Sequence, residues 1–202
     1  AFLGSWIRTR NIPPKEITVG SKWGYTYTAD WKVQTLDDVA HEVKSHTLGV
    51  LTRQHSESLD ELGEYLNLYH IHSATIESGV LENQEVLQHL ASIRENGTKI
   101  GISVSGPRQA DTIQKALAIK CNDGSLLFGS VQATWNLLEP SAGPALQMAH
   151  DAGLTVIVKE TLANGRLTPR NSDSGFSEKL ALVTRIATEA KASVDAFALA
   201  TV

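Results

Sequence analysis

The feature that most constrains the fold of this chain is an alternation of short apolar runs with amphipathic stretches. The runs have the length and Val, Ile and Leu content of strands buried on both faces. They lie at residues 16–22, 66–72, 99–105, 127–134 and 154–160. The stretches between them carry apolar residues at helical spacing, such as Leu59, Leu62 and Leu66. This alternation predicts an α/β fold in which right-handed crossovers join parallel strands.

Periodicity leaves two architectures open for these strands. A doubly wound open sheet accepts five strands, whereas a parallel barrel needs eight strands and typically about 250 residues. The chain has 202 residues and shows no internal repeat, low-complexity tract or linker. We therefore expect residues 1–202 to form a single domain.

Composition excludes several classes of protein. The net charge is −4 and the basic residues are scattered, so we expect no nucleic-acid or anionic membrane partner. No apolar stretch approaches the roughly 18 residues of a membrane span, and no secretory signal precedes the first strand. Cys121 is the one cysteine, which rules out an internal disulfide and favours a reducing, cytoplasmic compartment.

Several familiar catalytic and cofactor motifs do not occur in the sequence. It has no G-x-G-x-x-G fingerprint, no P-loop lysine motif and no G-x-S-x-G elbow. It also lacks H-E-x-x-H and paired cysteines, so we expect no metal site.

Polar side chains stand at or near the carboxyl end of each predicted strand, where the preceding residues are apolar. Each has an ordinary structural explanation, such as a snorkelling lysine, a packed histidine, a helix cap or an internal hydrogen bond. In a parallel sheet, however, these ends open onto one edge, where ligands bind. We therefore expect a shared site there. His70 shares a face with His72 but lies further from the strand end. The candidates in chain order are Lys22, His72, Ser103, Gln132, Lys159 and Glu160.

The order of these strand motifs resembles the aldo-keto reductase family. The similarity runs along nearly the whole chain and is most specific in its second motif. The matching segments are 19–22 (VGSK), 62–72 (LGEYLNLYHIH), 99–103 (KIGIS), 130–136 (SVQATWN) and 156–168 (VIVKETLANGRLT). The resemblance implies a (β/α)8 TIM barrel, here a partial barrel with about five strand–helix units, which would be the third to seventh strands. It also implies an extended NADP(H) bound across the carboxyl edge without a Rossmann motif.

The resemblance implies roles for particular residues. Members of the family reduce a carbonyl with an Asp, Tyr, Lys and His tetrad, of which Lys22 and His72 match the lysine and the histidine. Ser103 and Gln132 match residues that hold the nicotinamide carboxamide. The remaining cofactor-binding positions fall on Lys159, Glu160, Leu162, Asn164 and Arg166.

Some family features have no counterpart here. The tetrad Asp and Tyr would precede Ala1, and the segment that grips the 2′-phosphate would follow Val202. We therefore expect the 202-residue chain to be part of a longer barrel and not to catalyse by itself. Tyr25 and Tyr27 do not match the position of the family tyrosine.

Two further positions depart from the family pattern. Val104 stands where Asn or Arg often follows the serine, and Lys159 stands where an aromatic ring often stacks on the nicotinamide.

The expected function is NADP(H)-dependent reduction of a small aldehyde or ketone, or oxidation of the alcohol. One alternative is a non-catalytic, cofactor-binding or regulatory barrel of the same family. The other is an unrelated barrel enzyme in which Lys22 forms a Schiff base.

Overall fold

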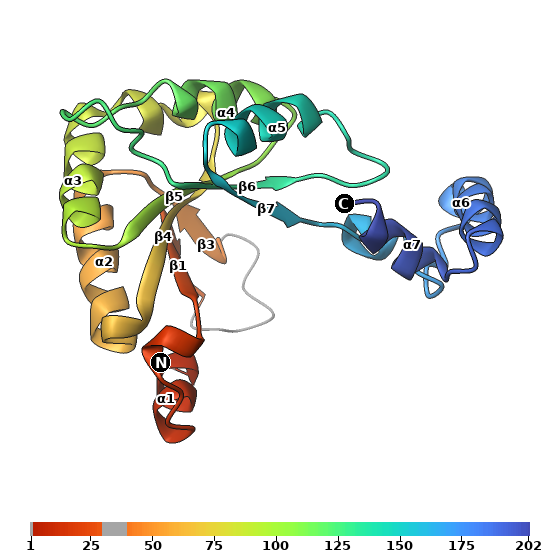
Figure 1. Cartoon of the computed structure of the whole chain (residues 1–202), viewed down its shortest axis with the longest axis horizontal. Helices are drawn as coiled ribbons and strands as arrows, with labels where there is room; N and C mark the ends of the chain where they lie inside the picture. The colour runs from red at the N-terminus through yellow and green to blue at the C-terminus, as the bar shows by residue number, and fades with distance from the viewer. Residues whose placement is uncertain (1, 30–39) are drawn as a thin grey trace.

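A computed structural model of the chain describes residues 2–29 and 40–202. Its main element is a sheet of five parallel strands, which confirms all five predicted strands with shifts of a few residues at their ends (Figure 1). The strands in sheet order are β1 (Val19–Trp23), β4 (Leu66–Ala74), β5 (Lys99–Val104), β6 (Ser130–Thr134) and β7 (Thr155–Lys159).

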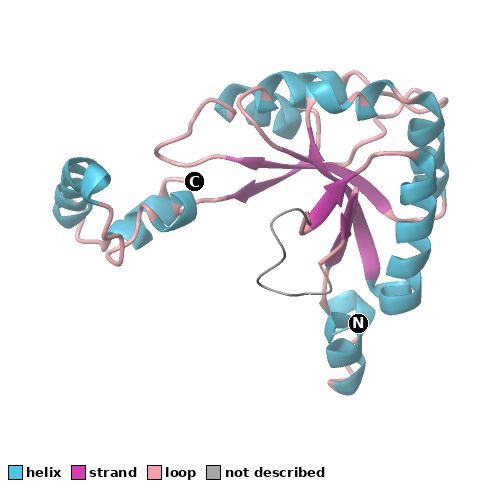
Figure 2. Cartoon of the chain, turned by 180° about the vertical axis from the view of Figure 1, so that it is seen from behind, coloured by secondary structure: helices cyan, strands magenta, loops and turns pink. Residues whose placement is uncertain are grey.

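The strand order decides between the two architectures. Each strand pairs with the next parallel strand along the chain, and the order never reverses as it does in a doubly wound sheet. Four helices cover the convex side of the curved sheet and leave the concave side to other elements (Figures 1 and 2). The described part of the chain is therefore a portion of a (β/α) barrel, open at β1 and β7. The covering helices are α2 (Leu48–Leu62), α3 (Gln84–Glu95), α4 (Gln109–Leu117) and α5 (Gly143–Asp151).

The core lies between the sheet and these helices. Side chains alternate across each strand, and the convex-facing residues of the inner strands β4, β5 and β6 are mostly apolar and buried. Tyr69, Ile71, Ile100, Ile102 and Val131 have no exposed surface. The alternate set faces the concave side and carries the polar residues.

The spacing that we read across Leu59, Leu62 and Leu66 does not belong to one helix. Helix α2 ends at Leu62, and Gly63 adopts φ 54°, a conformation that glycine reaches without strain. Leu66 begins β4 and is buried there, while Leu59 is 42% exposed. The prediction that these three leucines lie on one helix was therefore wrong. The spacing is the same as in a helix, but Leu66 belongs to the strand that follows.

A hairpin that the sequence did not indicate sits at the carboxyl end of β1. Its strands are β2 (Tyr25–Tyr27) and β3 (Glu42–Lys44), which pair antiparallel. The Gln54 side chain of α2 holds it: Oε1 accepts from the Gly24 N–H at 2.8 Å, and Nε2 donates to the Tyr25 carbonyl at 2.7 Å. These bonds hold the hairpin beside the edge where we expect the site.

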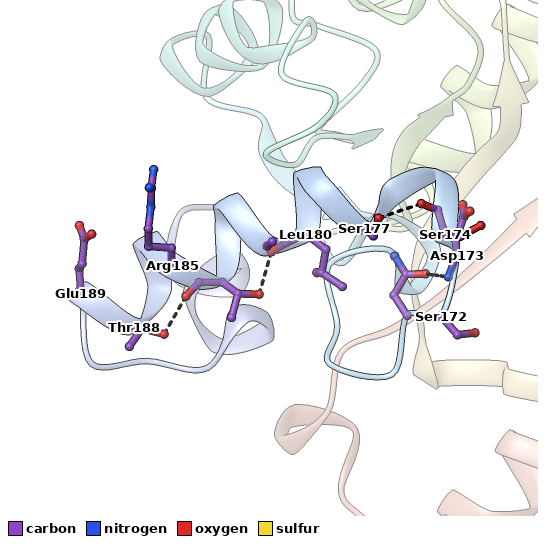
Figure 3. A pocket seen from close by; sticks show the side chains of 11 residues that line it. Ser172, Asp173, Ser174, Ser177, Leu180, Arg185, Thr188 and Glu189 are labelled. Atoms are coloured by element: carbon purple, nitrogen blue, oxygen red, sulfur yellow. Dashed lines mark hydrogen bonds between the residues drawn. The ribbon is translucent and has the colours of Figure 1, made fainter.

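The chain after β7 extends away from the sheet (Figure 1). It holds α6 (Ser177–Glu189) and α7 (Val194–Ala200). Ala163, Leu167 and Ala198 form a small second core. An open groove of about 720 Å³ runs along α6 beside residues 171–174 (Figure 3). The shorter elements are α1 (Phe2–Thr9), η1 (Pro14–Glu16), η2 (Gly63–Tyr65), η3 (Ile76–Ser78), η4 (Val80–Glu82), η5 (Ala163–Gly165) and η6 (Ser174–Phe176).

Within the described residues, none of the helices is both long and apolar enough to cross a membrane.

Candidate active site

The register of the sheet brings the predicted residues onto one surface. Lys22 pairs with His70, and His70 pairs with Gly101, which in turn pairs with Ser130. Two residues closer to the carboxyl ends, Ser103 pairs with Gln132 and Gln132 with Ile157. Because neighbouring residues in register share a face and the face repeats every second residue, His72 and Lys159 follow on the same side. The concave carboxyl edge therefore collects residues from all five strands.

His70 forms the floor of this surface rather than part of its opening. It is 3% exposed, and its Nε2 lies 2.8 Å from the Ser130 Oγ. Burial, with smaller contributions from the nearby Lys22 and His72, lowers the pKa of His70 to about 4. His70 is thus a neutral, hydrogen-bonded core histidine.

Gly101 makes that hydrogen bond possible. A Cβ atom at this position would lie 2.0 Å from the His70 Cδ2 and 2.2 Å from the Ser130 Oγ. No side chain fits between the two partners, so the sheet brings imidazole and hydroxyl together over the bare backbone of Gly101.

His72 lies above this floor with its ring half-buried. The Tyr25 ring of the hairpin packs against it, with 4.7 Å between ring centroids. The His46 Nε2 donates to the His72 backbone carbonyl at 2.9 Å, which holds the strand end in place. Desolvation lowers the pKa of His72, and Lys22, Lys159 and Lys44 lower it further. The imidazole is therefore neutral near pH 7, able to donate one hydrogen bond and accept another.

Ser103 and Gln132 form a preset polar pair. The Ser103 Oγ donates to the Gln132 Oε1 at 3.0 Å, and Ser103 is 1% exposed. This bond fixes the amide plane of Gln132, whose two N–H donors remain available alongside the acceptor lone pairs of Ser103. The internal hydrogen bond that could have explained Gln132 is thus present. It also leaves the donors and acceptors that a carboxamide requires.

The segment after β7 continues the same edge. Lys159 is half-buried, and desolvation is the main reason that its pKa is lowered. Glu160 adopts φ 59°, and its carbonyl accepts from the Asn136 Nδ2 at 2.9 Å. The ion pair between Lys159 and Glu160 that sequence adjacency could suggest is not among those the described residues form.

The loop that follows turns tightly. Ala163, Asn164 and Gly165 have φ values of 49°, 55° and 89°. Asn164 and Arg166 are exposed, while Leu162 packs against the second core. Asn164 and Arg166 thus present side chains to a ligand, whereas Leu162 could contribute only its backbone.

Sequence reasoning missed Lys44 and His46, and it did not place Tyr25 beside His72. The Lys44 Nζ donates to the Ser73 carbonyl at 2.6 Å, directly after His72. An alternating Tyr25-Thr26-Tyr27 run was the one available strand signal. Across residues 2–29 and 40–202, no three His, Cys, Asp or Glu side chains gather as metal ligands.

Fold and site together define a class: a parallel α/β barrel protein with polar, partly desolvated groups at the carboxyl edge of its strands. Comparison with known families is more specific. The family model described as "Aldo/keto reductase family" matches residues 1–200. The chain belongs to the aldo/keto reductase family, as its motif order predicted.

Solved structures agree on the fold. The aldo-keto reductase AKR11C1 from Bacillus halodurans, in its holo form, superposes with a TM-score of 0.72 at 19% identity, over 98% of this chain and 61% of that one. The glycerol dehydrogenase AKR11B4 from Gluconobacter oxydans gives 0.65 at 19% identity, over 95% and 61%. This chain therefore spans about three fifths of their length. A search of curated proteins found no match.

Proposed function

We propose that this chain carries the carbonyl- and cofactor-binding edge of an NADP(H)-dependent oxidoreductase that reduces a small aldehyde or ketone, or oxidises the alcohol. One observation carries the proposal: neutral His72 and Lys22 share a concave face with the preset Ser103–Gln132 pair. Family membership over residues 1–200 supports this assignment. The lone Cys121 favours a cytoplasmic setting.

The residues present fit a nicotinamide cofactor. A carboxamide needs an acceptor for its N–H₂ and a donor for its carbonyl, which Ser103 and Gln132 offer. Beyond them, exposed Asn164 and Arg166 would meet the pyrophosphate, with Glu160 and Leu162 shaping the turn. When bound, NADP(H) supplies or accepts the hydride. Lys159 would lie beside the nicotinamide as a cation, not as a stacking ring.

The chain's own residues then act on the carbonyl oxygen. Neutral His72 donates a hydrogen bond that polarises the carbonyl, and the Lys22 ammonium stabilises the negative charge that develops on the oxygen. By resemblance, the proton comes from a tyrosine phenol whose position no residue of this chain matches. Tyr25 packs on the His72 ring and follows the lysine, so it is a neighbour of the site rather than the family's acid.

The test separates cofactor binding from chemistry. We would titrate the chain with NADPH and NADH by nicotinamide fluorescence, then follow NADPH oxidation with butanal in the protein that contains all tetrad residues. Gln132→Ala should weaken NADPH binding about tenfold, since it removes hydrogen bonds to the cofactor. His72→Ala should leave binding within about twofold and lower any turnover by roughly a hundredfold. Lys179→Gln on α6 is the matched control. Failure to bind either nucleotide would refute the proposal.

A non-catalytic, cofactor-binding barrel is the second candidate. Two observations favour it: Lys159 stands where a stacking ring is common, and Val104 is fully buried against the sheet rather than reaching toward a ligand. Saturable NADPH binding without turnover in the protein that contains all tetrad residues would select this function.

A further inference from the structure

Three lysines from three different elements lie near enough to His72 to affect its charge. Lys22 comes from β1, Lys44 from the hairpin strand β3 and Lys159 from β7. All three act electrostatically on the His72 ring, and Lys22 also acts on Lys159. The Lys44 ammonium reaches the Ser73 carbonyl, one residue beyond His72. The rim of the site therefore carries three cations close to His72.

The backbone at Ser73 holds Lys44 in this position. The pairing of β4 with β5 shifts register between Ile71 and Ala74, and Ser73 adopts φ 51°. At this irregularity in the pairing, the Ser73 carbonyl accepts a hydrogen bond from the Lys44 Nζ. One of the three ammonium donors is used in that bond, and two remain for a ligand.

Among residues 2–29 and 40–202, no carboxylate forms an ion pair with any of these three lysines. Glu77 lies near enough to act on Lys44, but its carboxylate is paired with Arg108. Glu160 acts on Lys159 and is itself exposed. Desolvation is the main cause that lowers the pKa of Lys44 and of Lys159. Lys159 is half-buried, whereas Lys44 is exposed at the rim, where an anion can reach its ammonium group.

The position of Lys44 distinguishes it from the cofactor-binding residues. Those lie on β5, β6, β7 and the loop beyond, whereas Lys44 stands over the end of β4 on a hairpin attached to β1. An anion held by Lys44 would thus belong to the molecule whose carbonyl meets His72.

We propose that the substrate of this site is an aldehyde or ketone that bears an anionic group, a carboxylate or a phosphate, which Lys44 binds at the hairpin rim. The inference rests on the proposed function, because it takes His72 as the group that meets the carbonyl. Lys44 determines specificity by selecting a charged substrate, and Lys22 and Lys159 add to the attraction.

The experiment compares matched ligands by calorimetry on the chain with NADPH present. The probes are succinate semialdehyde, its methyl ester and glyceraldehyde 3-phosphate. We expect succinate semialdehyde to bind at least about tenfold more tightly than its ester, as a charge-assisted hydrogen bond implies. Lys44→Gln should abolish most of that preference, and Lys179→Gln, on exposed α6, should keep it. Tighter binding of the phosphate probe would identify the anion as a phosphate.

The outcomes separate this inference from the proposed function. Equal affinity for acid and ester, or a preference that survives Lys44→Gln, overturns the anionic substrate while NADPH binding still stands. The inference is also overturned if the wild-type chain binds NADPH but none of the three probes. NADPH affinity measured in the same Lys44→Gln sample must stay within about twofold, since a larger loss would place Lys44 in the cofactor site instead.

Discussion

At the scale of residues, two histidines two positions apart do different work. His70 is buried and hydrogen-bonded to Ser130, sixty positions along the chain, so it is not available to a ligand. The half-buried His72 faces the rim. Period-two spacing placed both on one face, but sequence could not show which ring the core would take. That choice depends on Gly101, which leaves room for a hydroxyl from a third strand.

The positive charges on the rim should affect the measured pKa of His72. Lys159 and Lys44 both lower the pKa of His72, so removing either charge removes a lowering influence. We expect Lys159→Gln and Lys44→Gln each to raise this pKa, as measured by NMR from the imidazole Cε1–H shift. An unchanged His72 titration in both variants would show that the lysines point away from the ring. Lys179→Gln provides the baseline.

His70 should make the fold sensitive to acid. Its pKa is about 4 in the folded protein and about 6.5 when unfolded, so the unfolded chain binds more protons between these values. The free energy of unfolding should fall as pH drops from about 6.5 toward 4, with His70 accounting for up to about 3 kcal/mol. Denaturant unfolding of the wild type and His70→Gln at both pH values tests this. The prediction would be contradicted if the unfolding free energy of the wild type fell no more between the two pH values than that of His70→Gln.

At the scale of elements, Gly101 in β5 is the position at which we most clearly expect a substitution to destabilise the sheet. A methyl group there would push apart His70 and Ser130, and we expect Gly101→Ala to cost about 1–3 kcal/mol of unfolding free energy. Gly20 in β1 is the matched control, because its added Cβ would meet Leu68 at an ordinary 3.6 Å. Urea denaturation of both variants decides the matter. Equal stability of the two would mean that the packing around Gly101 relaxes.

The elements also show what the sequence could and could not predict. The five strands of the sheet lie in short, mostly apolar runs, and such runs predict buried strands from the sequence alone. Strand β3 is three exposed residues, Glu42–Lys44, with no apolar pattern at all. Its place depends on pairing with β2 and on bonds from Gln54, which are long-range contacts. Lys44 therefore could not be assigned to the site before the fold was known.

The C-terminal helices illustrate the same limit. Helix α6 carries Leu182, Val183 and Ile186 at helical spacing. The apolar stripe of α6 nevertheless stays open, with Leu182 50% and Ile186 41% exposed. Periodicity identifies a face that can be buried, but it does not show what lies against that face.

At the scale of the whole molecule, stability should differ between the sheet and the segment after β7. The segment has a small hydrophobic cluster of Ala163, Leu167 and Ala198 and projects away from the helix-covered sheet (Figure 2). We expect backbone amides of α6 and α7 to exchange with deuterium much faster than those of β4 and β5. Mass spectrometry of exchanged peptides measures this. Equal protection throughout would show that the segment and the sheet unfold as one cooperative unit.

The central claim is that the concave carboxyl edge binds a nicotinamide cofactor beside a carbonyl. The most direct test is a fluorescence titration of the chain with NADPH, with Ser103→Ala and Gln132→Ala alongside. The account predicts saturable binding that each variant weakens and that Lys179→Gln leaves unchanged. Absence of binding to NADPH and NADH, or binding indifferent to both Ser103 and Gln132, would contradict it and leave the family resemblance as one of fold alone.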